Sequence, residues 1–167
     1  MDSIWRTSVW QQYGAAIAMF EEAIRLCPDH LWTAVEWDDP EDVRYGQFWF
    51  VAFHTLCWMH LFLTGSEAGF APPPPFTRRA LPEHPYTKEQ ILAYLASCRS
   101  LCQSTIEAMT DEHAQQRCVF AWMELSFLEL QLYSMRHVQE HATQLGLILG
   151  QQDVTGVDWI PRAKDAA

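Results

Sequence analysis

Basic residues are scarce in this chain of 167 residues, which holds 11 Lys and Arg against 21 Asp and Glu. The formal net charge is therefore −10 at pH 7. Proteins that bind nucleic acid or anionic lipid neutralise phosphate groups with clustered basic side chains. The composition thus argues against nucleic acid and against a membrane surface as partners.

The chain also lacks an uninterrupted apolar stretch of the length that a membrane span requires. Its most apolar run, residues 47–63, is slightly short and contains His54 and His60, so we expect a buried helix there. The opening MDSIWRTSVW shows no basic region followed by an apolar region and a small-residue cleavage site. These features predict that no signal peptide is present and that the protein is cytoplasmic.

No CxxC pair occurs among the five cysteines, which are Cys27, Cys57, Cys98, Cys102 and Cys118. An odd count without paired spacing argues against a disulfide framework and suits a reducing compartment. We expect most of these thiols to be small buried hydrophobes. Cys57, one turn after His54, and the pair Cys98 and Cys102 are accordingly interpreted as core residues.

Strand-like alternation of useful length is absent, whereas helical patterns cover most of the chain. Thr87 and Gln90 have the spacing of a capping box, which starts a helix at about residue 88. Four consecutive prolines within residues 70–86 forbid a regular helix and favour an extended crossover. The predicted fold is all-α, a single domain of residues 1–167 that forms a four-helix bundle with a long crossover between helices 2 and 3. The expected helices comprise residues 3–27, 47–63, 88 to about 110, and about 123–149, with a loop over residues 28–46.

The last predicted helix carries two histidines where apolar residues are expected. His137 and His141 share the inward seam of that helix with Phe127, Leu130, Ser134, Gln144 and Ile148. Four-residue spacing places the two imidazoles on nearly the same face, one turn apart. The best further donor is His54, in the middle of the second helix. The pattern indicates an open metal site of His54, His137 and His141 plus water, and the alternative is a set of half-buried histidines that only hydrogen-bond.

The letters HVQEH, residues 137–141, also match the H-x-x-E-H signature of inverted zinc proteases, in which the Glu is the general base. That class requires an α/β setting and a further acidic ligand downstream, whereas only a short tail follows His141. Glu140 lies about 60° round the helix from His137 and is interpreted as a rim residue or a partner of a metal ligand. Tyr133, one turn before His137, either offers a phenol to a metal-bound species or is a core aromatic. Glu140 and Tyr133 are the two catalytic candidates.

The stretch RHVQEHATQLGLIL, residues 136–149, resembles the closing helix of the DinB/YfiT-like superfamily, in which an RHxxxHxxQL pattern pairs with one His from the second helix. The stretch at residues 80–99 is similar to the segment that opens the third helix in that group. The sequence departs from the family pattern at Glu140, where a second His is frequent, and at Ala142-Thr143, where Val-Gly is frequent. These departures remove no ligand, but they leave the substrate open.

The resemblance implies a four-helix bundle, a homodimer and a divalent metal ion held by His54, His137 and His141. Family members with assigned chemistry include thiol-dependent S-transferases and isomerases that use bacillithiol or mycothiol. The implied function is a metal-dependent thiol S-transferase, or a hydrolase, with Zn or Ni as the metal and Fe, Mn or Co as alternatives. The competing hypothesis is a non-catalytic dimeric scaffold or small-molecule-binding module with a structural metal or none. The residues expected at a dimer interface are Leu128, Leu132 and Met135.

Overall fold

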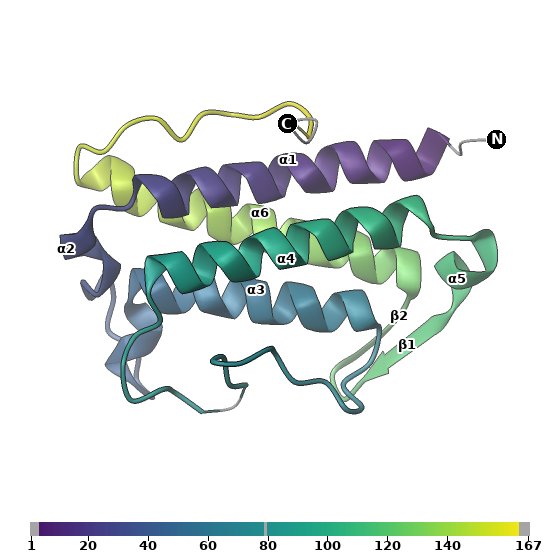
Figure 1. Ribbon diagram of the computed structural model, residues 1–167, viewed down its shortest axis with the longest axis horizontal. Coiled ribbons are helices and arrows are strands. Elements are labelled where there is room, and N and C mark those ends of the chain that lie inside the picture. Colours follow the sequence, from purple (N-terminus) through teal and green to yellow (C-terminus); the bar gives the residue numbers. More distant parts are fainter. Residues whose placement is uncertain (1–3, 79, 164–167) are drawn as a thin grey trace.

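The computed structural model describes residues 4–78 and 80–163. Its long helices are α1 (Ile4–Leu26), α3 (Phe48–Thr64), α4 (Lys88–Glu107) and α6 (Phe127–Gln151), which lie side by side (Figure 1). Both α1 and α3 pack against α4 and against α6. The predicted all-α fold is confirmed, and the bounds of the first three long helices agree with the prediction to within a few residues.

The long crossover allows the neighbouring helices α3 and α4 to run in the same direction. In Figure 1 both helices start at the same end of the bundle, and residues 65–78 and 80–87 return along its outside. Gly65 ends α3 with a positive φ of 73°, a conformation that glycine adopts without the clash of a Cβ. At the end of the crossover, the side chains of Thr87 and Gln90 accept hydrogen bonds from each other's backbone N–H groups. The predicted capping box therefore starts α4.

The core is formed by the inward faces of the long helices. One face of α1 is buried, with Tyr13, Ile17, Phe20 and Ile24, and Cys27 just after the helix is buried as well. Cys98 and Cys102 are buried as predicted, and all five cysteines are free thiols. Ser134 fits the seam of α6 because its hydroxyl oxygen lies 2.6 Å from the hydroxyl oxygen of Tyr13. That hydrogen bond satisfies two polar groups that would otherwise be buried without partners.

The start of α6 differs from the prediction, because residues 123–126 form a strand. This strand, β2 (Met123–Ser126), pairs antiparallel with β1 (Arg117–Phe120), and the short α5 (Asp111–Gln115) precedes the pair. The predicted start of the last helix at about residue 123 was therefore wrong. Each strand has four residues, too few for the alternation of buried and exposed side chains to stand out in the sequence. The helix begins where Ser126 and Glu129 form a capping box, a signal that the sequence contains.

The segment between α1 and α3 is more ordered than the predicted loop. It contains α2 (Asp29–Trp32) and the 3-10 helix η1 (Val43–Gly46). The backbone N–H of Glu36 donates to the carbonyl oxygen of Gly46 at 3.0 Å, beside a bridge between Val35 and Gln47. Gly46 has no room for a side chain, since a Cβ there would collide with the carbonyl oxygen of Trp37. The segment is thus folded back on itself beside the start of α3.

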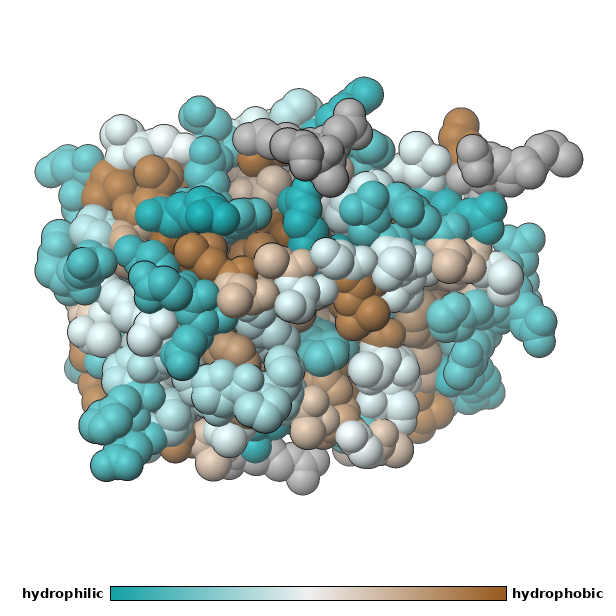
Figure 2. Space-filling model, in the orientation of Figure 1, coloured by the Kyte–Doolittle hydropathy of each residue, from teal (hydrophilic) through white to brown (hydrophobic). Residues whose placement is uncertain are grey.

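The surface is mixed in character. On the face shown in Figure 2, hydrophilic residues interleave with smaller apolar areas. Within the described ranges, no helix combines the length and the hydropathy that a bilayer crossing requires. The homodimer stays a prediction: Leu132 is 38% exposed, whereas Leu128 and Met135 pack partly against the core.

Candidate metal centre

The three predicted histidines converge where α3 packs against α6. The Nε2 atom of His137 lies 3.3 Å from Nε2 of His54 and 3.1 Å from Nε2 of His141. The candidate ligand atoms of the three residues all lie within 4.8 Å of one another. Bonds of about 2.0–2.1 Å from a tetrahedral zinc ion place neighbouring ligand nitrogens about 3.3 Å apart. The spacing of the imidazoles therefore fits a single metal ion.

Helical geometry positions each of these rings. His54 lies between the rings of Phe50 and Trp58, which are one turn before and after it on α3, with centroid distances of 6.0 Å and 6.1 Å. His137 and His141 are one turn apart on α6, and their rings meet edge-on at 4.5 Å. The four-residue spacing thus aligns the two rings of α6, and the packing of α3 brings the third ring against them.

Burial keeps two of the three imidazoles uncharged at neutral pH. Desolvation, with a smaller contribution from His141, lowers the pKa of His54 to about 4. Desolvation also lowers the pKa of His137 to about 3, and the neighbouring His141 and His54 add to the effect. A metal ion requires the neutral form, because only that form has a free nitrogen lone pair. At pH 7, protons therefore do not compete for His54 or His137.

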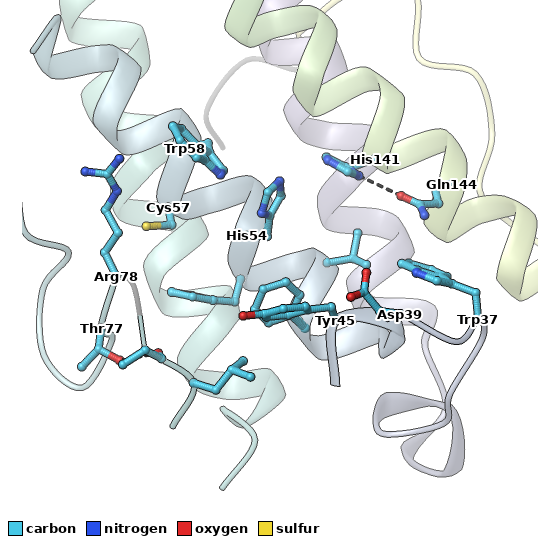
Figure 3. A pocket seen from close by; sticks show the side chains of 15 residues that line it. Trp37, Asp39, Tyr45, His54, Cys57, Trp58, Thr77, Arg78, His141 and Gln144 are labelled. Carbon is cyan, nitrogen blue, oxygen red and sulfur yellow. Dashed lines mark hydrogen bonds between the residues drawn. The ribbon is translucent and has the colours of Figure 1, made fainter. Parts of the chain in front are cut away.

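Gln144 orients the ring of His141. Its amide oxygen Oε1 lies 2.8 Å from Nδ1 of His141 (Figure 3). Since a carbonyl oxygen only accepts, Nδ1 carries the proton and donates it, and the lone pair is on Nε2, the atom that faces His137. In the described part of the chain, Nδ1 of His137 is buried without a partner. A cation at the centre of the cluster would stabilise nitrogens that otherwise face one another in an apolar setting.

Replacing Gln144 with leucine is expected to weaken metal binding by about 10–100-fold, the usual effect of removing a residue that orients a metal ligand. Leucine keeps the apolar volume but removes the acceptor for the Nδ1–H of His141. Competition with a chromophoric chelator measures the Zn²⁺ affinity. Gln139→Leu is the matched control, because the Gln139 amide contacts Thr143 and Met19 instead. Equal affinities of the two variants would contradict the role of Gln144.

A cavity of about 510 Å³ opens beside the cluster and reaches His54 and His141 (Figure 3). Its walls are mainly apolar, with several aromatic side chains, and come from α3, from α6, from the segment before α3 and from the crossover. A volume of this size suits a small organic molecule. The sequence analysis missed Trp37, Tyr45 and Arg78 among the lining residues, because they belong to segments predicted to be a loop and an extended connection.

The other candidate site residues from the sequence, Glu140, Tyr133 and Cys57, are less well placed for a role in catalysis or metal binding. Glu140 is exposed and does not line the cavity. Tyr133 is not the core aromatic of the alternative interpretation, since it is 40% exposed and meets Phe62 edge-on. Catalytic roles for Glu140 and Tyr133 stay predictions. Cys57 lines the cavity, but burial raises the pKa of its thiol to about 11 despite the opposing effect of Arg78, which agrees with a packing role.

Comparison with known families adds an independent observation. The family model described as DinB superfamily matches residues 12–145. The match covers most of the chain and includes His54, His137 and His141. Among curated proteins, no sequence matched the chain.

Proposed function

Since the chain belongs to the DinB superfamily, we propose that it binds a divalent metal ion through His54, His137 and His141. The observation that carries this proposal is the spacing of the three Nε2 atoms, with neighbouring pairs 3.3 Å and 3.1 Å apart. Low pKa values at two of the rings support it, because they keep the imidazoles neutral. Zn²⁺ and Ni²⁺ are the proposed ions, with Fe, Mn and Co as alternatives, since all of them accept imidazole ligands.

The ligand set favours a reactive site over a structural one. Structural zinc sites use four protein ligands, whereas catalytic sites use three and keep a position for water or substrate. In the described part of the chain, no fourth His, Cys, Asp or Glu joins the cluster. The proposed reaction is transfer of a low-molecular-weight thiol to an electrophile. A bound divalent ion lowers the pKa of a coordinated thiol and so supplies a thiolate at neutral pH.

The protein's own residues bind and orient the reactants. The aromatic walls of the cavity, with Trp37, Tyr45 and Trp58, bury the apolar part of a substrate and exclude water. Gln144 holds His141 with its Nε2 lone pair toward the cluster. In the transfer, the substrate sulfur forms a bond to an electrophilic carbon and the leaving group departs with the electron pair of its bond. The thiol proton passes to solvent.

Thiol transfer is tested by following the conjugation of 1-chloro-2,4-dinitrobenzene with a panel of small thiols. We expect the metal-loaded wild type to accelerate the reaction of at least one thiol, and His137→Ala to lose that acceleration. His84→Ala is the control, because this histidine is exposed in the crossover. Equal rates for wild type and His137→Ala would contradict the proposal.

A non-catalytic dimeric binding module is the second candidate. It is favoured by the aromatic lining of the cavity, which suits retention of a small ligand without chemistry. Fully metal-loaded protein that accelerates no thiol would support this function. The inverted zinc protease is not favoured, since β1 and β2 are the strands of the described residues and form no α/β sheet, and Glu140 lies outside the cavity lining.

A further inference from the structure

One cation of the crossover is built into the wall of the cavity. Arg78 lines the cavity, and only 16% of its side chain is exposed. Its Cζ atom lies 5.2 Å from the ring centroid of Trp58 and 5.9 Å from that of Phe70. The carboxylate of Glu67 pairs with its Nη2 atom. Two aromatic rings and one carboxylate therefore hold the guanidinium in place.

Glu67 engages only part of this guanidinium. The group has five N–H donors in a planar fork, and its bond to Glu67 uses the Nη2 atom alone. Among the described residues, Arg78 makes no other hydrogen bond that would use the remaining donors. In the described part of the chain, no guanidinium nitrogen of Arg78 is among the buried polar atoms that lack a partner, so the remaining donors are accessible to an acceptor that enters the cavity. Arg78 is thus suited to receive an anion, and a guanidinium binds a carboxylate with two parallel hydrogen bonds.

The charges that line the cavity are separated. Asp39 lies beside Trp37 and Tyr45, whereas Arg78 lies on the other side of His54 (Figure 3). Among the described residues that line the cavity, Arg78 is the only Arg or Lys and Asp39 is the only acidic residue. An anionic group is therefore attracted toward Arg78 and repelled from Asp39. This asymmetry gives a bound anion one preferred orientation.

We propose that the thiol substrate carries a carboxylate or a similar anionic group, which Arg78 binds while the sulfur reaches the histidine cluster. This inference rests on the proposed function and adds the substrate class to it. Trp58 separates the two binding points, since its ring centroid lies 6.1 Å from that of His54 and 5.2 Å from Cζ of Arg78. A ligand that passes the indole ring requires a spacer of several atoms, and the apolar walls bury that spacer.

Two thiols of equal length test the proposal. The compounds 6-mercaptohexanoate and 6-mercaptohexanol have the same spacer and differ in their terminal charge. Each is titrated into Co²⁺-loaded protein, and the thiolate-to-cobalt absorption band reports binding. We expect the wild type to bind the carboxylate about tenfold more tightly, an effect typical of one charge-assisted hydrogen bond. Arg78→Met keeps an apolar stem over Trp58 and should bind both thiols alike.

Arg44→Met is the matched control, because Arg44 also pairs with a carboxylate, that of Asp42, but does not line the cavity. It should keep the preference for the carboxylate. Equal binding of the two thiols by wild type, or a preference that survives in Arg78→Met, overturns the proposal and leaves the thiol-binding function standing. No absorption change with either thiol overturns the proposed function and this inference with it.

If Arg78→Met fails to fold, a second variant tests the role of Arg78. Glu67→Gln removes the carboxylate that offsets the charge of Arg78 but keeps an amide of the same size. The preference for 6-mercaptohexanoate should increase, because the guanidinium then loses the carboxylate with which it pairs. An unchanged or smaller preference in Glu67→Gln overturns the role of Arg78.

Discussion

Replacing His137 with alanine is expected to weaken Zn²⁺ binding by more than about 100-fold, beyond the range seen when only an orienting residue is removed. His137 provides the nitrogen that lies between the other two, at 3.3 Å from His54 and 3.1 Å from His141. Two remaining imidazoles leave most of the coordination sphere unfilled. His54→Ala and His141→Ala should show losses of the same order, since each removes one of three ligands. Chelator competition gives the affinities.

The control for this series is His60→Ala. His60 is on the same helix as His54 and is half-buried, but its Nδ1 atom pairs with the Tyr94 hydroxyl at 3.0 Å. Its removal should leave the Zn²⁺ affinity unchanged. Circular dichroism checks that every variant is folded. Near-wild-type affinity in a folded His137→Ala protein, or equal losses in His60→Ala, would contradict the three-histidine site.

The metal-free protein is expected to lose stability as the pH falls below about 6.5, the usual pKa of an unfolded-chain histidine. In the folded state, burial lowers the pKa of His54 to about 4 and that of His137 to about 3. Between these values and pH 6.5 the unfolded chain binds protons that the folded protein does not, so acid favours unfolding. The contribution of the neutral His54 and His137 to stability is complete above pH 6.5. It is lost as the pH falls through the pKa values that these histidines have in the folded protein. For two groups, the loss by pH 4.5 is on the order of 5 kcal/mol.

Urea unfolding in the presence of EDTA, repeated across this pH range, measures the effect. His137→Leu removes one of the two histidines of the cluster whose pKa burial lowers. The number of protons taken up on unfolding, which the slope of the unfolding free energy against pH measures, should therefore fall by about one. The exposed His84 provides the control, and His84→Ala should keep the wild-type slope. Identical slopes for wild type and His137→Leu would show that the cluster is not the source of the acid sensitivity.

The fold and the histidine cluster could both be predicted because helical periodicity encodes them directly. The spacing of His137 and His141 sets their common face whatever the tertiary packing, and the apolar run around His54 requires a buried helix. Capping signals also act locally, so the capping box of Thr87 correctly predicted the start of α4. At α6 the sequence contains the capping box of Ser126, but the prediction began the helix at about residue 123 and therefore did not include the hairpin.

The cavity, in contrast, could not be predicted from the sequence. Its walls depend on contacts between segments that are distant in the sequence, such as the guanidinium of Arg78 over the ring of Trp58. The position of Trp37 depends on the close approach of its backbone to Gly46, which no periodic pattern reveals. Proline-rich and acidic connections carry little local signal, because their conformation is set by what they pack against. The ligand-binding part of the site therefore required the three-dimensional structure.

X-ray absorption spectroscopy at the metal edge of the Zn²⁺-loaded, tag-free protein tests the central claim most directly. Three histidine ligands predict nitrogen scatterers at about 2.0–2.1 Å, with the outer-shell pattern of about three imidazole rings and one lighter ligand. A sulfur shell at about 2.3 Å would instead place the metal on a cysteine such as Cys57. That result, or a protein that retains no metal after dialysis, would contradict the site formed by His54, His137 and His141.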